Sequence, residues 1–310
     1  MKQKLFLSLS ISLCFLLLFT ACKKNESQDQ DPPDQADVSA HAEDESEVSA
    51  EIDAAAYDAN SIMESNATLS GNNATVQNIV CDAEIAFDLE SDPMTATVTY
   101  NGSVCSNKRI RTGKVIVAMA KGTKWQDAGA LITLTFQDLK IVRKSDSARI
   151  TLNGTQSFIN VSGGLLSQLA SLQTITHTIT SNDLSVKFGD GDARKWQVAR
   201  KTVYTYNNGA NAAITGLHTE GDVSGIAEWG SNRQGVEFTT QIVEPIEVKQ
   251  SCDLRVTSGI VKHSTKFYSA TVTFGLDATG AVTSCPGLGH YYYKLNWMLN
   301  NQSIDVLLPY

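Results

Sequence analysis

Residues 131 to 136 read Leu131-Ile132-Thr133-Leu134-Thr135-Phe136, so apolar and polar side chains alternate along this stretch. Successive side chains of a β-strand point to opposite faces, which would turn Ile132, Leu134 and Phe136 towards a core and the threonines towards water. The same period of two recurs elsewhere in the chain, at residues 95–100, 149–152, 236–242 and 270–274. The pattern predicts strands of an antiparallel sheet that is buried on one face.

Turn-forming residues separate these runs, among them Asn101-Gly102, Asn207-Asn208-Gly209 and Asp277 to Gly280. Strands joined by short turns are usually neighbours in a sheet, which predicts an antiparallel meander. The strands around 129–143 and 174–206 look longer than the usual length of about five or six residues. Long strands favour a twisted sheet, a sandwich or an open half-barrel. We therefore predict an all-β protein with a single β domain over residues 76–310.

Residues 1–21 have the three parts of a bacterial export signal. Two lysines precede an apolar run of 15 residues from Leu5 to Phe19, and Thr20-Ala21 come directly before Cys22. The run is shorter than the roughly 20 residues that a membrane span needs, which favours a cleaved signal peptide. Residues 18–22 resemble the lipobox of bacterial lipoproteins, in which the cysteine sulfur receives a diacylglycerol. We therefore expect a lipid on Cys22 that anchors the chain to a membrane.

The composition changes after Cys22. Between Glu26 and Glu64 there are 13 acidic residues and no Lys or Arg, whereas from Ser65 onward there are 20 acidic and 21 basic residues. An acidic segment with little apolar surface is expected to stay disordered, so residues 22–75 are predicted to form a tether, with a short amphipathic helix at 46–64. The rest of the chain is nearly neutral and has no basic stripe, so nucleic acid is not an expected partner.

Four cysteines remain when the signal peptide and Cys22 are set aside, and an even number in an exported chain predicts disulfides. Cys81-Asp82 precedes a strand-like segment and Cys105, and Cys252-Asp253 precedes a similar segment and Cys285. This internal similarity predicts the pairs Cys81–Cys105 and Cys252–Cys285, each contributing roughly 3 to 4 kcal/mol in the chain-entropy model. Pairing between the two units, metal binding and free thiols are the alternatives.

Three further segments, Arg109–Val117, Asn232–Val236 and Glu244–Val248, together with the unit from Cys252 to Cys285, resemble a family of lipoproteins from Bacteroidota. The resemblance covers roughly residues 81–297. It implies an all-β fold, and the family has no established molecular function. With the expected lipid anchor, we predict a location at the outer membrane, with the domain facing either the cell surface or the periplasm.

The sequence contains few signs of catalytic chemistry. Its histidines lack the spacing of metal or catalytic motifs; they are His41, His177, His218, His263 and His290. No nucleophile elbow or phosphate-binding glycine loop is present. We therefore predict no enzymatic activity, no cofactor and no metal site. The stretch Asp146-Ser147-Ala148 matches a short O-glycosylation pattern of Bacteroidota-like envelopes, and an ordinary turn is the alternative.

The leading functional hypothesis is therefore a non-enzymatic binding or structural domain for a glycan or protein partner. The four tryptophans, or Tyr291-Tyr292-Tyr293, could form a glycan-stacking platform, although aromatic residues are more often buried. The alternative is a carrier or chaperone for lipid-like ligands. A carrier would need a continuous cavity under a curved sheet, lined by inward residues such as Ile132, Leu134 and Phe136.

Overall fold

The structure is a computed structural model that describes residues 35–71, 80–104, 109–181, 183–283, 285, 289–299 and 302–310. All of these residues belong to one compact unit that spans Pro33–Tyr310. The predicted signal peptide, Cys22 and the part of the predicted tether before Gln35 lie outside the described residues.

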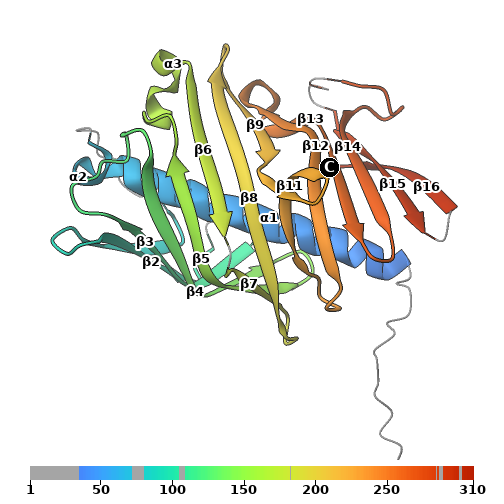
Figure 1. Cartoon of the computed structure of the whole chain (residues 1–310), viewed down its shortest axis with the longest axis horizontal. Coiled ribbons are helices and arrows are strands. Elements are labelled where there is room, and N and C mark those ends of the chain that lie inside the picture. Colours follow the sequence, from blue (N-terminus) through green and yellow to red (C-terminus); the bar gives the residue numbers. More distant parts are fainter. Residues whose placement is uncertain are drawn as a thin grey trace, which may run out of the picture. The chain divides into compact units, whose positions relative to one another are not determined.

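One antiparallel sheet of sixteen strands dominates the described part of the chain (Figure 1). The strands are β1 Ala83–Asp88, β2 Met94–Asn101, β3 Arg109–Met119, β4 Ala130–Arg143, β5 Arg149–Asn160, β6 Thr174–Ser181, β7 Ser185–Phe188, β8 Ala193–Tyr206, β9 Ala210–Gly216, β10 His218–Glu220, β11 Val223–Ser231, β12 Glu237–Lys249, β13 Arg255–Thr265, β14 Ser269–Leu276, β15 Tyr292–Leu299 and β16 Gln302–Pro309. The helical elements are α1 Gln35–Ser65, α2 Ala67–Ser70, α3 Leu169–Leu172 and the single turns η1 Leu166–Gln168 and η2 Gln250–Cys252.

The strand order confirms the predicted meander. It runs β1-β2-β3-β4-β5-β6-β8-β11-β12-β13-β14-β15-β16, while β7 pairs with β5 and β8, β9 pairs with β8 and β12, and β10 pairs with β11. The alternation predicted for 131–136 is also present in β4, because Ile132, Leu134 and Phe136 are buried and the residues between them are more exposed. The all-β prediction is therefore confirmed.

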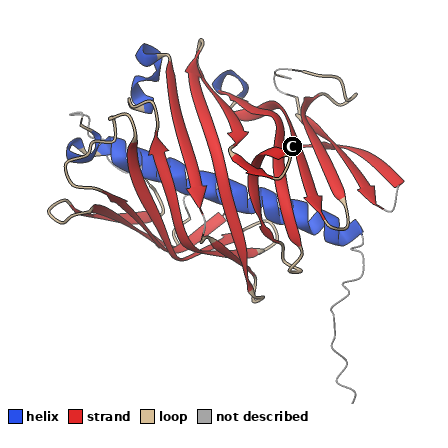
Figure 2. Cartoon of the chain, in the orientation of Figure 1, coloured by secondary structure: helices blue, strands red, loops and turns tan. Residues whose placement is uncertain are grey.

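Helix α1 lies along one face of this twisted sheet (Figure 2). The segment from Gln35 to Ser65 contains no Gly or Pro and is rich in Ala and Glu, which favour helices. Its apolar stripe is completely covered and forms one core cluster with the inward residues of the strands; the stripe comprises Val48, Ile52, Ala55, Ala59, Ile62 and Met63. Among the described residues, no helix combines the length and the apolar character that a bilayer span requires.

The helix requires a correction to the predicted domain boundary. A helix was expected at 46–64 as part of the tether, but α1 spans 31 residues and packs in the core, so the folded unit begins well before residue 76. The physical reason is ion pairing. Acidic side chains of α1 face arginines of the sheet, so their burial is compensated, and the helix can add its apolar stripe to the core.

The disulfide prediction is confirmed in part. Cys252 and Cys285 form a disulfide that closes a loop of 33 residues around the β13–β14 hairpin. Cys81 is also disulfide-bonded, but Cys105 lies outside the described residues, so the Cys81–Cys105 pair stays a prediction.

Candidate functional site

A row of polar side chains on α1 faces the sheet. His41, Glu45, Ser49 and Asp53 follow one another at intervals of four residues, which places them on one face of the helix. From the start of the row to its end, the side chains contact β13, β12, β11 and β8, which are consecutive strands of the sheet. The row therefore forms a polar seam between helix and sheet.

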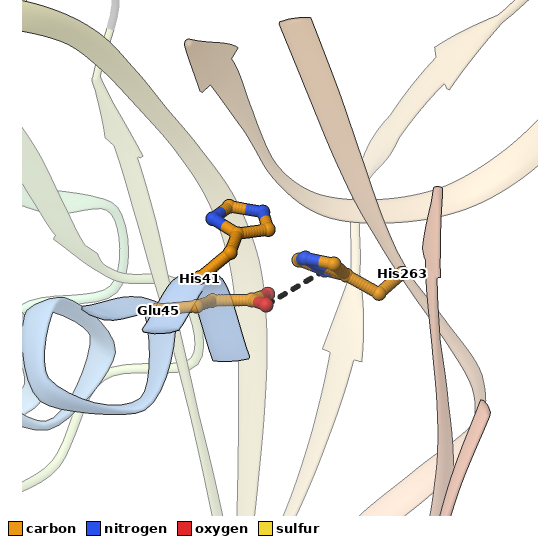
Figure 3. A group of neighbouring side chains, drawn as sticks. All are labelled: His41, Glu45 and His263. Carbon is orange, nitrogen blue, oxygen red and sulfur yellow. Dashed lines mark ion pairs between the residues drawn. The ribbon is translucent and has the colours of Figure 1, made fainter. Parts of the chain in front are cut away.

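The first part of this seam brings together His41, Glu45 and His263 (Figure 3). His263 Nδ1 lies 2.7 Å from a carboxylate oxygen of Glu45. The imidazole rings of His41 and His263 are 4.4 Å apart, and Phe238 packs against both rings. Thr240, which is paired with His263 across β12 and β13, places its hydroxyl 2.8 Å from His263 Nδ1 and donates a hydrogen bond to Glu45.

Burial and close neighbours shift the pKa values of the two helix residues of this cluster. Burial, together with the neighbouring His263, lowers the pKa of His41 to about 4, so its ring is neutral near pH 7. Burial tends to raise the pKa of Glu45, but its interactions with His263, His41 and Thr240 together hold that pKa below its usual value. Both ring nitrogens of His41, and Nε2 of His263, are buried without a hydrogen-bond partner. The cluster offers donor atoms for a ligand within 4.8 Å of one another.

Deeper along the seam, Glu228 on β11 joins Trp196 and Arg200 of β8. The Trp196 indole donates a hydrogen bond of 2.6 Å to Glu228, Ser49 donates another, and Arg200 lies between Glu228 and Asp53. Burial raises the pKa of Glu228 to about 7 against the opposing effect of Arg200. Its carboxyl is therefore held on all sides by protein groups, which indicates a structural role.

A groove of about 510 Å³ lies on another side of α1, between β3 and β4 and the strands β15 and β16. We call it the α1 groove. Its lining combines carboxylates, guanidinium groups and apolar side chains; it consists of Ala42, Glu43, Ser46, Glu47, Ala50, Glu51, Arg109, Ile141, Arg143, Tyr293, Leu295 and Leu308.

Two arginines that line the α1 groove are paired with glutamates of α1. Arg109 Nη1 lies 2.7 Å from Glu51, and Arg143 Nη1 lies 3.5 Å from one oxygen of Glu47. The other oxygen of Glu47, Oε1, is buried and has no hydrogen-bond partner. Burial raises the pKa values of both glutamates, and the arginines oppose this shift. The groove therefore presents paired charges of both signs.

Half-buried aromatic rings lie next to the groove. Tyr293 lines it, and its ring centroid lies 5.9 Å from that of Tyr310, which is also 5.6 Å from Phe274. Of the predicted platform residues, Tyr291 is buried, whereas Tyr293 reaches the groove. Three tryptophans are buried, namely Trp125, Trp196 and Trp297, and Trp229 stacks on His218 at a centroid distance of 4.0 Å.

The structure places other predicted residues in plain structural roles. Ile132, Leu134 and Phe136 pack in the core with α1, where a carrier would hold its ligand. Asp146 accepts a hydrogen bond from the Ala148 backbone and pairs with Arg143, so residues 146–148 form an ordinary turn between β4 and β5. Glycosylation at Ser147 stays a prediction.

Sequence patterns did not reveal the histidine cluster. His41 and Glu45 are separated by one helical turn, but His263 lies more than 200 positions away, and only the docking of α1 brings it near. The spacing of His41 and Glu45 was the one available signal, and it is common on helices that bind nothing. No protein-family model, no curated protein and no solved structure matches this chain.

Proposed function

We propose that this chain is a lipid-anchored envelope protein whose β unit binds a glycan in the α1 groove without catalysing a reaction. The observation that carries the proposal is the α1 groove itself, whose lining combines the paired Glu47–Arg143 and Glu51–Arg109 groups with the half-buried Tyr293 ring. A lipid on Cys22 would hold the domain at the outer membrane, at the cell surface or in the periplasm.

The chemistry of the groove supports a glycan as its occupant. Sugar hydroxyls donate and accept hydrogen bonds, and the paired Glu47–Arg143 and Glu51–Arg109 groups offer both functions with little net charge. The C–H face of a sugar packs well on an aromatic ring such as that of Tyr293. A cavity of about 510 Å³ falls within the range of small-molecule sites.

The arrangement of the carboxylates supports binding over hydrolysis. Glycoside hydrolysis uses two carboxyl groups that flank the scissile bond from two sides. Glu47 and Glu51 project from one face of the same helix, one turn apart, and each is paired with an arginine. The carrier hypothesis has less support, because α1 packs over Ile132, Leu134 and Phe136, the residues that would line the cavity of a carrier.

The test is binding of the full chain, extracted in detergent, to a panel of defined neutral oligosaccharides. We expect at least one oligosaccharide to bind, and Tyr293→Ala and Glu47→Gln to weaken that binding at least about tenfold. The matched control is Tyr206→Ala, because Tyr206 is an exposed tyrosine at the end of β8 and does not line the groove. Equal binding by the wild type and both groove variants, or binding to none of the panel, would contradict the proposal. So would release of free sugar by the wild-type chain.

A further inference from the structure

The His41–Glu45–His263 cluster is separate from the α1 groove, and the proposed glycan site does not use it. None of its three residues lines the groove. It is built from two elements that are far apart in the sequence, the start of α1 and the end of β13. Its side chains are therefore brought together only by the tertiary fold.

We propose that His41, Glu45 and His263 together bind a divalent transition-metal ion, with Zn²⁺ as the best fit. The three residues supply one donor atom each, and these atoms lie within 4.8 Å of one another (Figure 3). Zinc sites use imidazole nitrogens at about 2.0–2.1 Å and carboxylate oxygens at about 2.0–2.2 Å, which separates ligand atoms by roughly 3.3 Å in a tetrahedron. Small side-chain rotations would bring the three donors to these distances.

The donor set matches the preferences of zinc. Two imidazoles and one carboxylate form a common three-residue ligand set for Zn²⁺, and imidazole suits this ion better than Ca²⁺ or Mg²⁺. A water molecule can fill the fourth position. The cluster is largely shielded from solvent, with His41 and His263 buried and Glu45 mostly covered.

The unpartnered nitrogens are an independent indication of a ligand. His41 is 1% exposed, yet neither of its ring nitrogens has a hydrogen-bond partner, and Nε2 of His263 is equally unpaired. Buried polar atoms in native proteins are nearly always satisfied, because leaving them unpaired loses the hydrogen bonds that water provided. Packing against Phe238 covers the rings but satisfies no nitrogen. A metal ion bound to one nitrogen of His41 would use the lone pair that the protein leaves free on that ring.

The surroundings hold the donors in position. Thr240 contacts both Glu45 and His263, as an outer partner of a metal ligand commonly does. His41 and Glu45 are fixed on successive turns of α1, and His263 is fixed within the β12–β13–β14 ladder. The ion would therefore join the first third of α1 directly to the sheet.

The test measures metal in the full chain and in matched variants. The wild-type protein, purified in detergent and freed of metal with a chelator, is titrated with Zn²⁺ and, separately, with Co²⁺ as a spectroscopic probe. We expect about one equivalent of Zn²⁺ per chain and the intense visible absorption of four-coordinate Co²⁺. Glu45→Gln and His263→Gln should each weaken Zn²⁺ binding by more than about 100-fold, since even outer-shell partners cost 10–100-fold.

The control variant is His218→Gln, because His218 lies in β10 outside the cluster and stacks on Trp229. It should bind Zn²⁺ like the wild type. Wild-type protein that takes up no Zn²⁺ at micromolar concentration would overturn the proposal, and this result does not depend on any variant. Retained binding in Glu45→Gln and His263→Gln would overturn it as well, since the ion would then lie elsewhere. Glycan binding by the metal-free chain is measured in parallel, so that the two proposals can fail separately.

Discussion

Arg111 on β3 joins α1 through Asp58: its Nη1 lies 2.7 Å from Asp58 Oδ2. The other side of the same guanidinium donates two hydrogen bonds, of 2.8 and 2.7 Å, to the carboxylate of Asp82. All three side chains are largely buried. One guanidinium thus pairs with two carboxylates from different parts of the chain.

Replacing this arginine should therefore be costly. Arg111→Met leaves Asp58 and Asp82 as buried carboxylates without a cation, and we expect a loss of about 3–5 kcal/mol in the free energy of unfolding. Arg149→Met is the control, because Arg149 and Asp190 form an exposed pair, which contributes about 0–1 kcal/mol. Denaturant titration of both variants measures the difference. Similar losses in the two variants would show that Arg111 does not hold α1 in place.

The packing of α1 gives a second prediction. Ile52 is fully buried on the side of the helix that faces the sheet, so Ile52→Ala should cost about 2–5 kcal/mol of stability. Tyr57 on the same helix is 67% exposed, and Tyr57→Ala should change stability by less than about 0.5 kcal/mol. If α1 were a dispensable tether, both substitutions would change the stability by similarly small amounts in thermal or denaturant unfolding.

His177 predicts a pH dependence of stability. Burial among aromatic rings lowers the pKa of His177 to about 4, whereas an imidazole of the unfolded chain titrates near 6.5. Below about pH 6.5 the unfolded state gains a proton that the folded state does not, so stability falls between about pH 6.5 and 4, by roughly 3 kcal/mol for this group. His177→Phe should flatten the stability profile in this window. An unchanged slope between the two proteins would show that His177 is not kept neutral.

The disulfides can be counted by mass. Alkylation of the unfolded chain before reduction should leave Cys81, Cys105, Cys252 and Cys285 unmodified, and alkylation after reduction should label all four. Proteolytic fragments then test the pairing of Cys81 with Cys105. A fragment that links Cys81 to any other cysteine would refute that pair.

The second disulfide is tested by stability. Cys252→Ser removes the bond to Cys285 and should lower the free energy of unfolding by about 2–5 kcal/mol.

Lipidation is tested at Cys22. The wild-type chain should incorporate a labelled fatty acid and sediment with membranes, and Cys22→Ser should lose both properties, because its hydroxyl cannot form the thioether. Protease treatment of intact cells then distinguishes the two orientations, since a periplasmic domain is protected until the outer membrane is broken. Fatty-acid labelling that persists in Cys22→Ser would contradict the assignment of the anchor.

Much of the fold follows from local patterns in the sequence. The period of two at 131–136 was sufficient to identify β4 and its inward face, because strand side chains alternate whatever the strand pairs with. The Cys252–Cys285 disulfide followed from an internal similarity between two short units. The packing of the helix was harder to predict. An acidic segment such as 35–65 is expected to stay in solvent unless its basic partners are known.

The sequence by itself determined the strands, their meander and the residues that face the core, because these depend on neighbours a few positions apart. Only the tertiary structure decided that α1 belongs to that core. Its acidic residues are stable there because arginines from β3, β4 and β8 lie opposite them, and no local pattern encodes such distant pairs. The same docking places His41 and Glu45 beside His263, so the metal proposal also depends on contacts that the linear sequence does not reveal.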